Sequence, residues 1–174
     1  MSVSHGVSRL EQAVRDRQTV TAYGESVQEP IDGVLVRRSV THADERGTLT
    51  EIYDGRWGFT DEPVTYVYVS TVRPGRVRGW VVHLEQDDRL FFVKGTSKLA
   101  LYDAREGSET FGRANVHYLG DHERSLVRIP AGVVHAVKNV GTDEAVFVNL
   151  PTEPYAHENP DKYRFPDGAI PVDL

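Results

Sequence analysis

Apolar and polar residues alternate in short runs along residues 34 to 150, and turn residues separate the runs. This alternation is typical of β-strands, because successive side chains of a strand point to opposite faces of a sheet. Strands are expected at 34–40, 49–53, 65–72, 77–84, 89–94, 97–103, 114–119, 125–129, 135–139 and 145–150. Roughly ten short strands at spacings of about 8–12 residues, with no long helical pattern between them, predict an antiparallel sandwich or barrel.

The two ends of the chain have different patterns. The stretch "SRLEQAVRDRQ" at 8–18 places Ser8 three residues before Glu11, which is a capping-box spacing, and predicts a short amphipathic helix. The segment that begins at Pro151 is rich in Pro, Asp and Glu. The expected organisation is an N-terminal helix and arm over 1–33, a barrel over 34–150 and an irregular tail on the barrel over 151–174.

Composition narrows the class of protein. The chain has 174 residues, a net charge of −6 with interspersed acids and bases, and no cysteine. A concentrated basic face for nucleic acid is not expected, and disulfides, zinc–thiolate sites and thiol nucleophiles are excluded. No apolar run approaches the roughly 20 residues that span a bilayer, and the first residues lack a signal-peptide core. We therefore expect a cytoplasmic protein with neither a nucleic-acid nor a membrane partner.

Two stretches resemble the two sequence motifs of the cupin superfamily. The second, "PAGVVHAVKN" at 130–139, keeps every fixed position of its motif. The first, "VVHLEQDDRLFFVKG" at 81–95, has Val81 at the first histidine position, His83 at the second and Asp88 at the glutamate position. Alternation places Val81 and His83 on one face of a strand. The resemblance implies that these side chains meet the second motif at the mouth of an all-β, double-stranded β-helix (jelly-roll) barrel.

Four further stretches resemble one family within this superfamily. These are "DERGTLTEIY" at 44–53, "PGRVRG" at 74–79, "DAREGSETFG" at 103–112 and "IPAGVVHAVKN" at 129–139. They are similar to the dTDP-4-dehydrorhamnose 3,5-epimerase family over roughly residues 34 to 155. The resemblance implies a homodimer that exchanges N-terminal strands and acts on 4-keto-6-deoxy sugars linked to deoxythymidine diphosphate.

The resemblance also assigns the catalytic roles of the family to positions in this chain. In the family a histidine base removes a proton beside the ketone, a lysine stabilises the enolate, and a tyrosine returns a proton. These roles fall on Val81, Asp88 (with Arg89 adjacent) and Asn149. Valine cannot accept a proton, so we expect a site rebuilt around other residues.

Three other residues are candidates for the proton transfers. His83 and His135 are the expected acid–base pair. The segment "TYVYVSTVRPGRVRG" at 65–79 resembles the sugar 3,4-ketoisomerases, which carry two histidines after the Arg-Gly, and this supports His83. Tyr155, in the tail, is the expected proton donor.

The expected ligand-binding residues would hold the nucleotide. Arg46 and Arg78 match the oxygens of a diphosphate, because a guanidinium fork pairs with phosphate. By resemblance, Arg46 and Glu51 reach the site of the neighbouring subunit. Tyr66 and Tyr68 lie where the family carries residues near the nucleotide, and a ring there would stack on a base. The full set is Arg46, Glu51, Tyr66, Tyr68, Arg78, Arg89 and Asn149.

Three functions follow from these residues. The first is an epimerase or isomerase of a nucleotide-linked 4-keto-6-deoxy sugar that needs no cofactor. The second is a mononuclear metal-binding cupin, in which His83, Asp88 and His135 hold a divalent Fe, Mn or Ni ion with open positions. The third is a module that binds a sugar nucleotide without catalysis.

Overall fold

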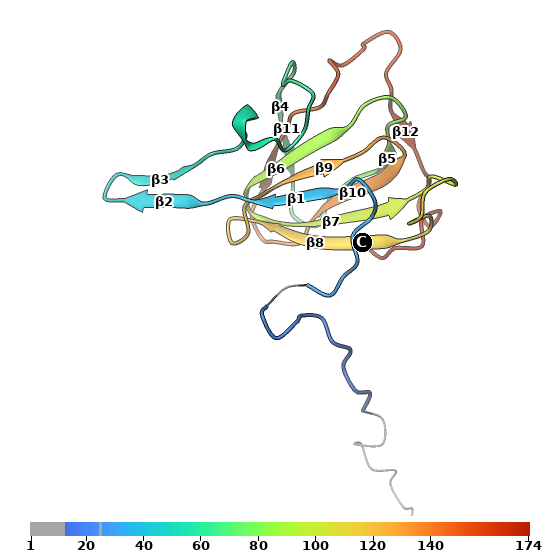
Figure 1. Cartoon of the computed structure of the whole chain (residues 1–174), viewed down its shortest axis with the longest axis horizontal. Coiled ribbons are helices and arrows are strands. Elements are labelled where there is room, and N and C mark those ends of the chain that lie inside the picture. The colour runs from blue at the N-terminus through green and yellow to red at the C-terminus, as the bar shows by residue number, and fades with distance from the viewer. Residues whose placement is uncertain (1–12, 25) are drawn as a thin grey trace, which may run out of the picture.

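The computed structural model describes residues 13–24 and 26–174, and this part of the chain is mostly β-structure (Figure 1). A short 3-10 turn, η2, lies at Gly55–Trp57. The strands are β1 (Leu35–Arg38), β2 (Thr41–Asp44), β3 (Gly47–Thr50), β4 (Tyr68–Val72), β5 (Val77–Val82), β6 (Asp88–Lys94), β7 (Thr96–Asp103), β8 (Ala114–Gly120), β9 (Ser125–Ile129), β10 (Val133–Asn139), β11 (Ala145–Asn149) and β12 (Tyr163–Arg164). Each strand expected from the alternation has a counterpart here, and β2 and β12 are additional.

Two five-stranded antiparallel sheets face each other. Their strand orders are β1-β9-β6-β11-β4 and β12-β5-β10-β7-β8. Strands that are far apart in the sequence are neighbours in each sheet, as in β5 beside β10 and β6 between β9 and β11. This arrangement confirms the expected double-stranded β-helix, or jelly-roll, barrel.

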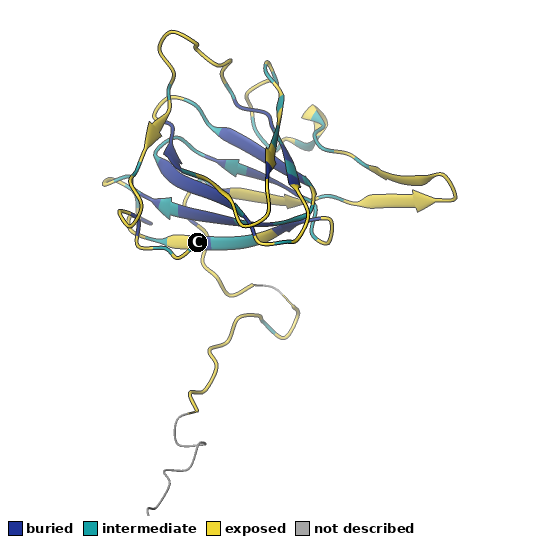
Figure 2. Ribbon diagram, turned by 180° about the vertical axis from the view of Figure 1, so that it is seen from behind, coloured by how far each residue is buried: buried dark blue, intermediate teal, exposed yellow. Residues whose placement is uncertain are grey.

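The apolar core lies between the two sheets. In β6, Leu90 and Phe92 point inward to this core, whereas Phe91 packs on the outer face against the segment that contains Phe59. Both faces of β6 are therefore buried, which explains why its sequence is a nearly continuous apolar run. Figure 2 shows this buried centre in dark blue.

The C-terminal tail covers the outer face of the second sheet. Ile170 and Phe165 pack against Trp80 of β5 in one apolar cluster. Strand β12 pairs with β5, so that Arg164 lies opposite Val81. The tail therefore belongs to the sheet that carries the first cupin motif, and it brings its own polar residues to the barrel mouth.

The short N-terminal helix predicted over 8–18 is not seen. Residues 13–18 are exposed and have no regular secondary structure, and residues 8–12 lie outside the described part of the chain. An isolated helix of this length is marginal in water unless its apolar face packs on something. Val14, an apolar residue of the predicted amphipathic helix, is 90% exposed and packs on no such surface.

Strands β2 and β3 form a hairpin that projects from the barrel (Figures 1 and 2). Its residues are exposed along almost the whole length, including Leu49 at 62%.

No helix in residues 13–24 and 26–174 combines the length and apolarity needed to cross a bilayer.

Candidate active site

A cavity of about 560 Å³ opens at one end of the barrel between the two sheets. Its walls come from β4, β6 and β11 on one side and from β5, β10 and the tail on the other. Leu90, Val137 and Phe147 belong both to the cavity wall and to the apolar core, so the cavity continues from the core. Most of the remaining wall is polar.

Close backbone packing brings β5 and β10 together at this cavity. A Cβ atom added to Gly79 would lie 2.5 Å from the Cβ of Ala136 and 2.9 Å from the carbonyl oxygen of His135. Only glycine fits there. The pairing of β5 with β10 contains a β-bulge. His135 lies opposite Val81, but Val137, two residues further along β10, lies opposite Arg78, three residues back along β5. The bulge re-aims the strand, so that Arg78 lines the cavity together with Val81.

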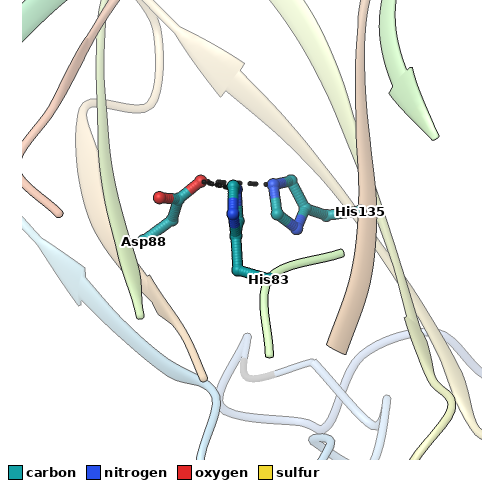
Figure 3. A group of neighbouring side chains, drawn as sticks. All are labelled: His83, Asp88 and His135. Atoms are coloured by element: carbon teal, nitrogen blue, oxygen red, sulfur yellow. Dashed lines mark ion pairs between the residues drawn. The ribbon is translucent and has the colours of Figure 1, made fainter. Parts of the chain in front are cut away.

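Three buried polar side chains converge on the cavity (Figure 3). The Oδ2 atom of Asp88 lies 3.4 Å from Nε2 of His83 and 3.3 Å from Nε2 of His135. The two imidazole centroids are 5.7 Å apart. The three side chains come from β6, from the residue after β5, and from β10, and we call them the His-Asp-His cluster.

Both histidines turn their other nitrogen to the backbone. Nδ1 of His83 contacts the carbonyl oxygen of Asp161, and Nδ1 of His135 lies 3.2 Å from the carbonyl oxygen of Val133. A carbonyl oxygen accepts but cannot donate, so each Nδ1 carries the hydrogen. Nε2 of each ring is therefore the nitrogen that faces Asp88, and it donates to that carboxylate when the imidazole is protonated.

The second oxygen of Asp88 is held by amides. Oδ1 accepts hydrogen bonds from Nε2 of Gln86 at 3.1 Å and from Nδ2 of Asn149 at 2.9 Å. The same Asn149 nitrogen donates to the hydroxyl of Tyr68 at 2.8 Å. The carboxylate is thus fixed in orientation, with Oδ2 presented to the two histidines.

Burial and charge act in opposite directions on the pKa values of this cluster. Burial would raise the pKa of Asp88, but the hydrogen bonds and charges of His135 and His83 outweigh it, and the pKa lies well below its usual value. Burial would lower the pKa of His83, but its hydrogen bond to Asp88, the charge of Asp88 and the carbonyl of Asp161 outweigh it and raise the pKa. The charged forms of Asp88 and His83 therefore stabilise each other inside the cluster.

Most of the chain matches a known protein family. The sequence model of dTDP-4-dehydrorhamnose 3,5-epimerase matches residues 28–174. The chain belongs to this family. A probable low-salt glycan biosynthesis epimerase, Agl13, of Haloferax volcanii is 36% identical over 137 residues, which cover 78% of this chain and 88% of that protein.

Solved structures with the same fold include members of this family. A dTDP sugar isomerase from Desulfovibrio desulfuricans is 25% identical with a TM-score of 0.76, and the match covers 82% of this chain and 91% of that one. A 3'-monoepimerase from Streptomyces bikiniensis, solved in complex with dTDP-quinovose, is 26% identical with a TM-score of 0.68, covering 83% and 80% of the two chains. The epimerase resemblance noted in the sequence is confirmed.

Two positions to which the family roles were assigned are inert as proton acceptors in this structure. Val81 is 7% exposed and lines the cavity beside His135. Asn149 is fully buried and uses its amide to hold Asp88 and Tyr68. The titratable imidazoles at the cavity are instead those of His83 and His135, and both lie beside Asp88.

The tyrosines predicted at the site also line the cavity. The rings of Tyr66 and Tyr68 are 5.6 Å apart. Burial, and then the charge of Asp88, raises the pKa of the Tyr68 hydroxyl. Tyr155 is 45% exposed at the rim and packs edge-on against His157 at 5.0 Å. Tyr155 is therefore the tyrosine of the cavity wall that is most open to solvent.

Three other candidates do not line the cavity. Arg89 points to the opposite face of β6, where its guanidinium donates to backbone carbonyls and to the hydroxyl of Thr60. Arg46 and Glu51 lie on and beside the projecting hairpin, and Arg46 pairs with Asp44 at 2.5 Å. Arg89 is a structural residue here, and the hairpin residues have no contact with this chain's own cavity.

Sequence reasoning missed two cations at the cavity. Lys162 and Arg164 line it from the tail. Burial, together with the charges of Arg164 and Arg78, lowers the pKa of Lys162, although Asp88 acts in the opposite direction. The available signal was the spacing of the two cations in "DKYRF" at 161–165, where Lys162 and Arg164 stand on either side of Tyr163 in extended chain.

Proposed function

We propose that this protein is an epimerase or isomerase that acts on a nucleotide-linked 4-keto-6-deoxy sugar by moving a proton at a carbon beside the ketone. The observation that carries the proposal is the buried His-Asp-His cluster in the wall of a cavity of about 560 Å³, in a chain of a sugar-epimerase family. The related monoepimerase of Streptomyces bikiniensis, solved with dTDP-quinovose, supports the ligand class.

The proposed chemistry needs groups that take and return a proton within hydrogen-bond reach of the sugar. His83 and His135 are the proposed acid–base pair, and Asp88 between them holds their orientation and balances their charge. Two imidazoles around one carboxylate can gain or lose a proton while the hydrogen bonds at Nδ1 keep both rings in place. Tyr155 is the proposed donor at the rim.

The nucleotide would be held by the charged part of the wall. Arg78, Lys162 and Arg164 face one cavity, and no side chain of the described residues forms an ion pair with any of them. Guanidinium and ammonium groups suit the oxygens of a diphosphate. The rings of Tyr66 and Tyr68 are the proposed stacking surface for the base.

Deuterium exchange tests the reaction. The protein is incubated in deuterated water with dTDP-4-dehydro-6-deoxyglucose, and incorporation at the carbons beside the ketone is followed by NMR. The wild type should exchange one or both positions. His83→Asn should lower the exchange rate by about 100-fold or more, because it removes a proposed proton-transfer group.

The control for this variant is His122→Asn, at an exposed histidine in the turn after β8. It should exchange like the wild type. Wild-type rates in both variants would remove His83 from the mechanism.

A second candidate is a module that binds the sugar nucleotide without turnover. Valine at position 81 and the structural use of Asn149 favour it, because neither residue can transfer a proton. Saturable ligand binding by the wild type without any exchange would establish this function in place of the first.

The proposal includes a homodimer. The β2–β3 hairpin carries Arg46 and is followed by Glu51, it projects from the barrel, and none of its residues lines this chain's own cavity. Strand β1 is an edge strand, with Leu35 and Val36 of β1 40% and 47% exposed. A second copy would give the hairpin and this edge a partner. The cytoplasmic location stays a prediction from the sequence.

A further inference from the structure

We propose that the hydroxyl of Tyr68 returns a proton to the sugar carbon from the wall that faces His83 and His135, so that the reaction inverts this carbon. The inference rests on the proposed function and names a second proton-transfer group for it. Tyr68 lies on β4, in the same five-stranded sheet as Asp88 of β6. It lines the same cavity as the two histidines.

Inversion of a carbon beside the ketone needs two groups on opposite faces of the sugar ring. One group removes the proton from the first face, and the other donates a proton to the second face of the planar enolate carbon. The imidazoles of His83 and His135 come from the end of β5 and from β10, in one sheet, whereas Tyr68 comes from β4 in the other. A sugar ring between these walls would have the imidazoles on one face and the phenol on the other.

Asn149 occupies the position to which the family resemblance assigns the tyrosine, and its amide holds the hydroxyl of Tyr68. The two residues lie opposite each other where β11 pairs with β4. Nδ2 of Asn149 donates to the Tyr68 hydroxyl at 2.8 Å and to Oδ1 of Asp88 at 2.9 Å. The backbone N–H of Arg89 donates to Oδ1 of Asn149 at 3.1 Å, which fixes the orientation of the amide. A phenol is therefore present one strand away from the expected position.

The hydroxyl of Tyr68 keeps its own hydrogen for a ligand. A phenol can accept one hydrogen bond and donate another. The oxygen of Tyr68 accepts from Asn149, and in the described part of the chain its hydroxyl has no further hydrogen-bond partner. The O–H group is therefore free to donate into the cavity.

The surroundings of this hydroxyl suit a group that loses its proton only during the reaction. Burial, and then the charge of Asp88, raises the pKa of the Tyr68 hydroxyl, which keeps the phenol neutral before the reaction. The hydrogen bond from Asn149 acts in the opposite direction on this pKa, because it stabilises the phenolate. This hydrogen bond is already in place when the proton leaves, so no reorganisation is needed at that moment.

The proton balance of one inversion closes with water. A C–H bond beside the ketone breaks, its proton goes to an imidazole, and its electron pair forms the enolate. The same carbon then takes the proton of the Tyr68 hydroxyl on its other face, and the ketone is restored. The imidazolium loses a proton to water and the phenolate gains one from water, so that both groups return to their starting forms.

Tyr155, the donor proposed at the rim, has different surroundings. Its side chain is 45% exposed and packs edge-on against His157. No residue in 13–24 and 26–174 forms a hydrogen bond with its hydroxyl, so a phenolate there would lack the amide that Tyr68 has. Tyr68 therefore has the setting that the inverting step needs.

The experiment compares two rates in deuterated water with dTDP-4-dehydro-6-deoxyglucose, both followed by NMR. One is the incorporation of deuterium beside the ketone, and the other is the formation of the inverted sugar. The wild type should show both. In Tyr68→Phe the formation of the inverted sugar should fall by about 100-fold or more, and deuterium incorporation by less than about 10-fold. The imidazoles can still remove a proton and return a deuteron to the same face.

The matched control is Tyr118→Phe, at a tyrosine of β8 that is 55% exposed and does not line the cavity. It should match the wild type in both rates. Circular dichroism checks the fold of Tyr68→Phe, and calorimetric titration with dTDP checks its cavity. The affinity should stay within about 3-fold of the wild type, because the aromatic ring is kept.

Three results would overturn the inference and leave the proposed proton transfer in place. These are inversion at the wild-type rate in Tyr68→Phe, an equal loss of both rates in that variant, and deuterium incorporation without inversion in the wild type. Loss of inversion in Tyr155→Phe, with wild-type rates in Tyr68→Phe, would place the donor at the rim. A wild type that incorporates no deuterium would overturn the proposed function and this inference with it.

Discussion

Asp88 and Arg89 are adjacent in the sequence, and they lie on opposite faces of one sheet. Asp88 joins the cavity, whereas Arg89 is fully buried beneath the segment before β4. The ligand-binding role expected for Arg89 rested on its nearness to the family's lysine position. The period of two in a strand argues against that role, because neighbours in a strand cannot share a face.

Replacement of Arg89 tests its structural role. Arg89→Met removes hydrogen bonds to four backbone carbonyls and to the hydroxyl of Thr60. The free energy of unfolding in urea should fall by about 3 kcal/mol, because these buried acceptors lose a charged donor. The affinity for dTDP should stay within about 2-fold of the wild type. The matched control is Lys94→Met, at an exposed cation of the same strand.

The opposite pattern, with lower dTDP affinity and unchanged stability in Arg89→Met, would return Arg89 to the binding site. Such a result would mean that the side chain of Arg89 points into the cavity when the ligand is bound.

The convergence of His83, Asp88 and His135 could be predicted from the sequence, and the orientation of the rings could not. The motif spacings place all three at one barrel mouth. The partner that fixes His83, by contrast, is the carbonyl of Asp161, 78 residues further along the chain. Every residue has a backbone carbonyl, so the sequence does not show which one contacts His83. The nitrogen of His83 that faces Asp88 is therefore known only once the tail is placed on the barrel.

At the scale of elements, the tail does more than cover the barrel. The carboxylate of Asp161 accepts hydrogen bonds from the backbone N–H groups of residues 84–86, directly after β5. The next residue, Lys162, then faces the cavity, and β12 continues along β5. A two-residue strand is too short to stand out as a periodic pattern, which is why the sequence predicted an irregular segment here.

Removal of the tail cations should weaken nucleotide binding. Lys162→Met and Arg164→Met should each lower the affinity for dTDP by about 10-fold, the size expected for one charge-assisted hydrogen bond to phosphate. Calorimetric titration measures this effect, and Lys94→Met serves again as the control. Unchanged affinity in both variants would show that the diphosphate lies elsewhere.

The N-terminal helix shows the limit of local patterns. A capping-box spacing and three apolar residues describe a helix that could form, but they do not supply the surface that would stabilise it. Most of the alternating strands behave differently, because they pair with two neighbours or pack on the core. The strand expected at 125–129 was therefore found with the same bounds as β9, while residues 13–18 carry no helix.

At the scale of the whole molecule, the residues that stabilise the jelly roll are mostly different from the polar residues that line its cavity. The apolar core between the sheets determines the fold, and its alternation is readable in the sequence. The cavity at one end is lined by polar residues that the strands present but do not need for pairing. Val81 and Asn149 belong to this cavity wall, in a chain of the epimerase family.

We propose that this cavity takes a nucleotide-linked sugar at a site formed around His83, Asp88 and His135. Calorimetric titration of the chelator-treated protein with dTDP tests the claim most directly. We expect saturable binding of one nucleotide per chain, weakened about 10-fold in Arg78→Met, because Arg78 belongs to the cavity wall. If the folded wild type showed no measurable binding, the nucleotide site at this cavity would be wrong, because every role proposed for the cavity wall depends on that nucleotide.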